Sequence, residues 1–229
     1  IYGTFGFGDA LFAMPFLSMI IGVKTATPLM TLNGCTLAAL LFIKHYKEVD
    51  WTHAKKLIFS AFLGIPFGIY FLKNGNETYT KIVLGIIITG IAVYNLFIKK
   101  EIKSVKIPRY LVYLFGFIAG VLGGAFNTGG PPIVIFGTLS GWSQLQFIGT
   151  LQGFFLPNDL FIISGQLFAG LINQSVVHYY LTGLPFLISA LWLGHHLRKK
   201  IPEGKFTPII YILLLVVGVL FLVRSLLLL

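Results

Sequence analysis

The chain has 229 residues, of which 56% are hydrophobic and only 10% are charged, and its formal net charge is +10. Together with a mean hydropathy of +0.88, this composition leaves too little polar surface to cover a water-soluble globule, so we expect the chain to lie in a lipid bilayer. The single cysteine, Cys35, excludes a disulfide framework within the chain and a metal site built from cysteines.

Most of the positive charge gathers in three short loops, at 44–56, 99–109 and 198–205. Cytoplasmic loops of membrane proteins carry an excess of Lys and Arg, so we expect these three loops on the cytoplasmic side of the cell (inner) membrane. The weakly charged segments 73–81 and 164–174 alternate with them and are expected on the other side. This distribution follows membrane sidedness, and it argues against a nucleic-acid partner.

The apolar segments predict an all-α, multi-pass membrane protein, because a spanning helix needs about 20 apolar residues. In chain order, a first repeat at 1–98 is expected to contain a hairpin at 1–22 and spans at about 26–43, 57–72 and 81–98. After a cytoplasmic basic linker at 99–109, a second repeat at 110–229 is expected to contain a hairpin at 110–141 and spans at about 144–163, 176–194 and 207–227. Each hairpin has to return to the side where it starts, either as a re-entrant broken helix or as two full crossings.

An internal repeat supports this division. A shift of 119 residues places Thr31-Leu-Asn-Gly34 on Thr150-Leu-Gln-Gly153 and Pro66-Phe67 on Pro185-Phe186. Three spans per repeat would invert the second half relative to the first. Inverted repeats with broken helices are typical of secondary transporters, which hold the substrate near the membrane midplane at the repeat interface. Chance similarity between apolar helices is the alternative interpretation.

A polar stretch, FNTGGPPIV at 126–134, interrupts the apolar second hairpin. Irregular backbone at membrane depth is tolerated only where it is buried in protein or lines a wet cavity. Gly129 and Gly130 allow a ligand to approach the backbone closely, and the two prolines that follow suit the first turn of a short helix that ends near Ser140.

The start of that short helix is a candidate anion site. Backbone amides and a partial positive charge at a helix start attract an anion in a low-dielectric cavity. Asn127 and Thr128 would add side-chain donors at the same point. The alternative is a tight turn in which Asn127 only caps a helix.

The first half has an equivalent stretch, GFGDALFAMP at 6–15, in which glycines again precede a proline and a short apolar helix that ends near residues 22–24. Together, the two motifs resemble those of the sulfite and organosulfonate exporter family TauE/SafE, which has G-x-G-G-G-x-x-x-x-P in its first half and a Gly-Gly-Pro-Pro version in its second. The resemblance covers nearly the whole chain. It implies an integral membrane transporter that moves small sulfur-containing anions such as sulfite or sulfonates, mostly outward.

The chain departs from the family pattern at one place. Gly6 and Gly8 match, but Asp9 and Ala10 stand where the commonest pattern has two more glycines. An ionisable residue at membrane depth is costly when charged and unpaired, so Asp9 is a candidate for proton coupling, with a helix cap as the alternative. Asp159, in LPNDL, is the second candidate for proton coupling, with a satisfied local kink as its alternative.

Further polar residues lie at equivalent repeat positions beside the breaks and would supply neutral donors, or simply bond one helix to another at roughly 1 kcal/mol each. The predicted substrate-binding residues are Gly8, Asp9, Thr31, Asn33, Asn127, Thr128, Gly129, Gly130, Thr150 and Gln152. Separately, Gly116, Gly120 and Gly124 recur at every fourth position and predict a close-packed helix face.

The sequence carries no histidine pattern of the H-E-x-x-H kind and no phosphate-binding loop, so we expect no enzyme, no catalytic residue, no metal and no cofactor. The predicted function is a secondary transporter that exports small sulfur oxyanions by alternating access around a midplane site between the two breaks. Its partners would be the anion, the lipid bilayer and a proton or other coupling ion. The alternative is a passive anion channel or a non-transporting membrane scaffold of the same fold. The sequence leaves the oligomeric state open.

Overall fold

The computed structural model describes residues 7–94, 96, 108, 110–198 and 206–226. Within these ranges the chain is helical and contains no strand. Of the predicted linker 99–109, only Pro108 lies within the described residues. Of the loop 198–205, only Arg198 does. The first residues of the hairpin 1–22 also lie outside them.

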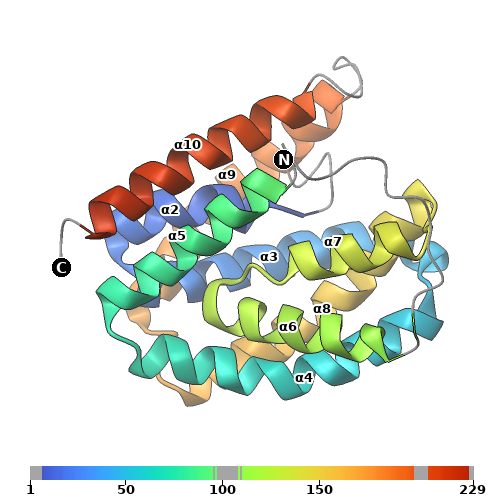
Figure 1. Ribbon diagram of the computed structural model, residues 1–229, viewed down its shortest axis with the longest axis horizontal. Coiled ribbons are helices and arrows are strands. Elements are labelled where there is room, and N and C mark those ends of the chain that lie inside the picture. The colour runs from blue at the N-terminus through green and yellow to red at the C-terminus, as the bar shows by residue number, and fades with distance from the viewer. Residues whose placement is uncertain (1–6, 95, 97–107, 109, 199–205, 227–229) are drawn as a thin grey trace.

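In chain order (Figure 1), the helices have these bounds: α2 (Asp9–Ile21), α3 (Val23–His45), η1 (Tyr46–Glu48), α4 (Trp51–Asn74), α5 (Glu77–Val93), α6 (Leu111–Phe126), α7 (Gly130–Leu139), α8 (Gln144–Phe168), α9 (Gln174–Arg198) and α10 (Phe206–Leu226). Polar caps fix several of the starts. The Asp50 side chain accepts from two amides of α4, Asn76 caps α5, and Ser143 with Gln146 forms a capping box on α8.

Three helical segments of the described chain are long and apolar enough to cross a membrane: 23–48, 51–74 and 144–168. They contain the predicted spans at 26–43, 57–72 and 144–163. Helices α2, α6 and α7 are apolar but shorter. Large apolar side chains are exposed around the outside, with Phe168 at 92% and Ile20 at 79%, which is the surface expected of a protein that faces lipid rather than water.

Helix α6 lies directly against α4 (Figure 1). A Cβ atom at Gly116, Gly120 or Gly124 would collide with the α4 backbone within residues 57–65. In the reverse direction, Gly64 and Gly68 of α4 leave room for the α6 backbone. The close-packed face predicted from the glycine spacing is therefore confirmed, and it holds two helix axes at the short distance that only small residues permit.

The interior has two main apolar clusters that meet near the α6–α7 connection. One cluster, between α2, α3, α5, α10 and the ends of α4 and α6, includes Met14 and Phe126. The other, between α4, α6, α7 and α8, includes Ile133 and Phe136. The chain passes from the first cluster to the second through residues 127–132, so the polar break lies between two apolar cores.

Candidate functional site

The second helix break is built around Asn127. This residue ends α6 in the left-handed conformation, with φ 54° and ψ 30°, and it is the one non-glycine residue with positive φ in the described part of the chain. Asparagine adopts this conformation more readily than most residues. Its Nδ2 donates to the Met30 carbonyl on α3 at 2.9 Å, so the break is fastened to a neighbouring helix.

Helix α7 starts at Gly130 and ends at Leu139, with Ser140 as its C-cap, as the sequence predicts. Its next two residues, Pro131 and Pro132, have no N–H, so the donors at this helix start are the amides of Gly129 and Gly130. Both glycines are buried. A Cβ at Gly129 would lie 2.7 Å from the Ala119 carbonyl oxygen, so this turn has no room for a side chain.

The first helix break begins at Gly8, whose φ of 93° places it in the left-handed region. Gly8 is the N-cap of α2 and Asp9 is the first helical residue, so the alternative in which Asp9 caps the helix does not describe this geometry. A carboxylate in the first turn is favoured by the helix dipole. It also occupies the helix end at which an external anion would otherwise bind.

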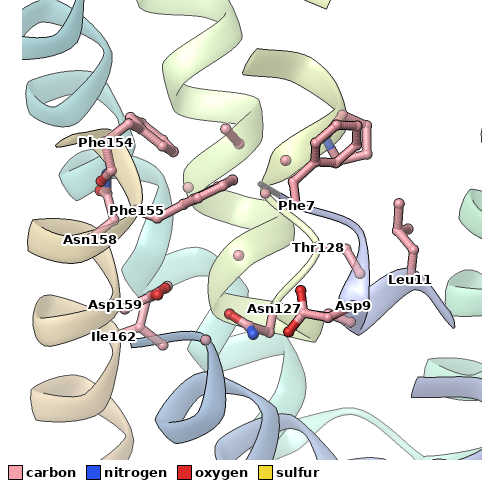
Figure 2. A pocket seen from close by; sticks show the side chains of 18 of the residues that line it. Phe7, Asp9, Leu11, Asn127, Thr128, Phe154, Phe155, Asn158, Asp159 and Ile162 are labelled. Atoms are coloured by element: carbon pink, nitrogen blue, oxygen red, sulfur yellow. The ribbon is translucent and has the colours of Figure 1, made fainter. Parts of the chain in front are cut away.

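Both breaks line one cavity with a volume of about 40 Å³ (Figure 2). A buried water needs roughly 10–15 Å³ of such volume, so the cavity has room for a few waters or one small ion. Its polar residues are Asp9, Asn127, Thr128, Asn158 and Asp159. Its other lining residues are Phe7, Gly8, Ala10, Leu11, Gly34, Ile65, Ala119, Gly120, Gly123, Gly129, Gly130, Pro131, Phe154, Phe155 and Ile162.

Figure 2 shows Asp9 and Asp159 on opposite sides of Asn127, with their carboxylates directed toward it. Asp159 is only 6% exposed. Gly34 of α3 lies beside this group, because a Cβ there would be 3.2 Å from Asn127 Nδ2 and 3.5 Å from Asp159 Oδ2. Helix α8 continues through Pro157, so the Pro-Asn-Asp sequence brings polar residues into the cavity without breaking the helix.

Six of the ten predicted substrate-binding residues line the cavity: Gly8, Asp9, Asn127, Thr128, Gly129 and Gly130. The predicted coupling residue Asp159 lines it as well. The structure therefore brings the two helix breaks together with a carboxylate from α8.

The other four predicted residues lie outside the cavity lining. The Thr31 hydroxyl donates to the Thr27 carbonyl at 2.9 Å and accepts from Gln166 Nε2 at 3.3 Å. Gln152 is fully buried at 0% exposure, and Asn33 is partly buried. For Thr31, this is the helix-to-helix bonding that was the alternative to a role in binding.

Thr150 fastens a loop to α8. Its hydroxyl accepts from the amide of Asp50 at 2.9 Å, and the Asp50 carboxylate bonds His53 Nδ1 at 2.6 Å. The His53 ring in turn packs on Phe136 of α7 and on Trp142, with ring centroids 5.5 and 6.4 Å away. This cluster connects the start of α4 to α8 and to the end of α7 away from the cavity.

Electrostatics in this cluster favour a charged Asp50. Burial raises the pKa of Asp50, but hydrogen bonds from the His53 side chain and from the backbone of His53 and Thr52 more than offset it. The net result is a pKa below the ordinary value of 3.8.

Sequence reasoning missed Asn158 and Gly34 as lining residues. Asn158 is adjacent to Asp159 and is 3% exposed. An amide side chain next to a carboxylate in an apolar helix could have indicated a residue that lines the cavity. Gly34 carried a signal only as part of the repeat. Among the described residues, no group of three or more His, Cys, Asp or Glu side chains is arranged to hold a metal ion.

The family model described as sulfite exporter TauE/SafE matches residues 1–221, a range that contains both helix breaks and α8. The chain matched neither the curated proteins nor the solved structures with which it was compared. Because the family match covers nearly all of the 229 residues, the chain belongs to the sulfite exporter TauE/SafE family and is an integral membrane protein of the transporter class.

Proposed function

We propose that the protein is a secondary transporter that exports small sulfur oxyanions, sulfite or organosulfonates, through the cavity between the two helix breaks. The observation that carries the proposal is that two breaks from opposite halves of the sequence, each at the start of a short helix, line the same cavity. Such a site is where transporters with broken helices hold their substrates.

The anion would bind at the start of α7. The amides of Gly129 and Gly130 and the partial positive charge of the helix end are suited to an oxyanion, and they need no cationic side chain. The volume of about 40 Å³ is far below the roughly 300–1,000 Å³ of sites for drug-sized ligands. In this conformation, the cavity therefore favours sulfite over larger organosulfonates.

Alternating access would come from two inverted repeats, 1–98 and 110–229. Helix packing supports this part of the proposal: α3 packs on α8 and α5 packs on α10, and these are the pairs that the repeat relates. In addition, α4 packs on α8 while α9 packs on α3. A two-fold axis in the membrane plane would exchange α3 with α8 and α5 with α10, and it would map the α4–α8 contact onto the α9–α3 contact. Rocking of one repeat against the other would open the site to either side.

The sidedness of the proposal rests on the basic loops. The loop at 44–56 has exposed Lys44, Lys47 and Lys55, and it joins two membrane helices. With this loop in the cytoplasm, the proposed direction of transport is from the cytoplasm outward across the inner membrane.

A binding panel tests the substrate class. Sulfite, thiosulfate, sulfate, sulfoacetate and taurine are added separately to the purified protein, and the thermal transition is followed. We expect the small oxyanions, and sulfite above all, to raise the transition temperature, because a ligand that binds only the folded state stabilises it.

The variant that tests the site is Gly34→Leu, which adds a side chain inside the cavity next to Asn127 and Asp159. We expect it to lose the anion-induced shift. The same change at Gly90 of α5, where a Cβ meets nothing within 4 Å, should keep the shift. A wild-type protein whose transition no anion in the panel moves would contradict the proposed substrate class.

A further inference from the structure

We infer that Asp9 and Asp159 take up protons when the anion binds, so that anion and protons occupy the cavity together. The inference rests on the proposed function, and it names the coupling ion and the groups that carry it.

The cavity is rich in acceptors and has no cation of its own. None of its described lining residues is Lys, Arg or His. Asp9 Oδ2 and Asn158 Oδ1 are buried atoms without a hydrogen-bond partner among the described residues. An unpaired buried acceptor is destabilising, and more so when it is charged, so a hydrogen-bond donor at either atom would stabilise the cavity.

The orientation of the two amide side chains is set by their surroundings. Asn158 Nδ2 donates to the Phe154 carbonyl at 2.6 Å, and Asn127 Nδ2 donates to the Met30 carbonyl at 2.9 Å. Because a carbonyl requires a donor, these bonds fix which end of each amide is the NH₂ group, and each NH₂ keeps a second N–H. What Asn158 presents without a partner is its oxygen, another acceptor beside Asp159.

The two carboxylates influence each other. Asp9 comes from α2 and Asp159 from α8, and their charges repel. The partly buried Cys35 thiol on α3 also lies close enough to Asp159 to interact with it. The residues that α4, α6 and α7 contribute to the lining are uncharged.

Charged groups farther along the surrounding helices have partners or solvent away from the cavity. On α5, Glu77 pairs with Lys81 at 2.8 Å. Other such groups are the Asp50–His53 pair at the start of α4, Lys24, whose Nζ donates to the Lys73 carbonyl, and the exposed Lys44, Lys47 and Lys55.

A bound oxyanion would place a third negative charge in this space. Isolated charges are costly in a low-dielectric interior, and like charges add to that cost. If each carboxylate accepts one proton from water, the anion becomes the sole charge and lies at the positive end of α7. Each carboxylic acid O–H then becomes a donor, available to an acceptor such as Asn158 Oδ1, and the protons return to water when the anion leaves.

The experiment measures the affinity for methanesulfonate from about pH 5 to about pH 9 at constant ionic strength. Methanesulfonate keeps one charge over this range, so a change in affinity reports on the protein. We expect affinity to fall at high pH by about tenfold per pH unit for each carboxylate that has to regain its proton.

Asp9→Asn and Asp159→Asn should each reduce this slope by one proton, and the double variant should bind independently of pH. Asp50→Asn removes a carboxylate outside the cavity and should keep the wild-type slope. Wild-type affinity that does not change with pH would overturn the inference, and so would affinity that follows Na⁺ at fixed pH.

A second readout needs no anion. Infrared spectra of the anion-free protein, recorded over the same pH range, should show a protonated carboxyl signal that grows as the pH falls and that each Asn variant reduces. Absence of that signal in the wild type, both without anion and with bound methanesulfonate, overturns the proton assignment. Failure of both methanesulfonate and sulfite to bind at every pH counts instead against the proposed function, because the infrared titration still reports on the carboxylates.

Discussion

Asn127 holds the second helix break in place through both its backbone and its side chain. Asn127→Gly keeps the left-handed backbone accessible but removes the hydrogen bond to the Met30 carbonyl, so we expect a loss of about 1 kcal/mol of stability. Asn127→Ala should lose about 1–2 kcal/mol more, because alanine is strained at a φ of 54°. Unfolding of the two variants in detergent checks the difference. Equal stabilities would show that the backbone conformation carries no strain.

Thr150 has a structural role in this account. Thr150→Val leaves the Asp50 amide without its acceptor, so we expect about 1–3 kcal/mol of lost stability and unchanged anion affinity. Thr150→Ser keeps the hydroxyl and should restore most of the stability. Lower anion affinity in a Thr150→Val protein of normal stability would instead show that Thr150 takes part in anion binding.

The Asp50–His53 pair gives a pH-dependent contribution to stability. The pKa of Asp50 is lower in the folded protein than its ordinary value of 3.8. The charge of Asp50 therefore stabilises the fold above that value, and the contribution is lost as the pH falls through the lowered pKa. Asp50→Asn keeps a capping side chain, so its unfolding temperature should lie below that of the wild type at neutral pH and approach it in acid. A constant difference across this range would contradict the assignment.

At the level of single residues, the sequence predicted the cavity residues of the second helix break better than the role of polar residues inside the long helices. Asn127, Thr128, Gly129 and Gly130 could be predicted because glycine and proline spacing encodes a local break. Thr150 could not be placed, since whether a helical threonine faces a cavity or a neighbouring loop depends on how distant helices pack.

At the scale of elements, α4 and α6 pack closely through their glycines. A Cβ at Gly120 would collide with the Ala61 backbone, so Gly120→Ala should cost about 1–3 kcal/mol through overpacking. Gly90→Ala on α5 meets open space and should be neutral or stabilising by up to about 1 kcal/mol. Thermal unfolding of both variants checks this contrast. A harmless Gly120→Ala would show that the two helices are farther apart than the structure has them.

The elements themselves followed from hydrophobicity and from caps. Helices α3, α4 and α8 cover the predicted spans and extend beyond several of their ends. The Asp50 cap lets α4 begin in polar sequence before its predicted span, whereas α8 begins at the predicted residue, directly after its Ser143 cap. The short helix α7 could be predicted from the two prolines after Gly130. That α2 and α8 line the same cavity could not be predicted, because only the packing of all these helices brings residues 9 and 159 together.

For the whole molecule, the membership in an exporter family and the shared cavity point to transport, while the inverted relation of the halves remains our proposal. Radiolabelled sulfite counterflow into proteoliposomes tests this central claim most directly. We predict saturable uptake that is accelerated by unlabelled sulfite inside the vesicles, and loss of that uptake in Gly34→Leu. Sulfite flux without acceleration from the opposite side would indicate a passive channel, no flux would indicate a scaffold, and either result would contradict the account.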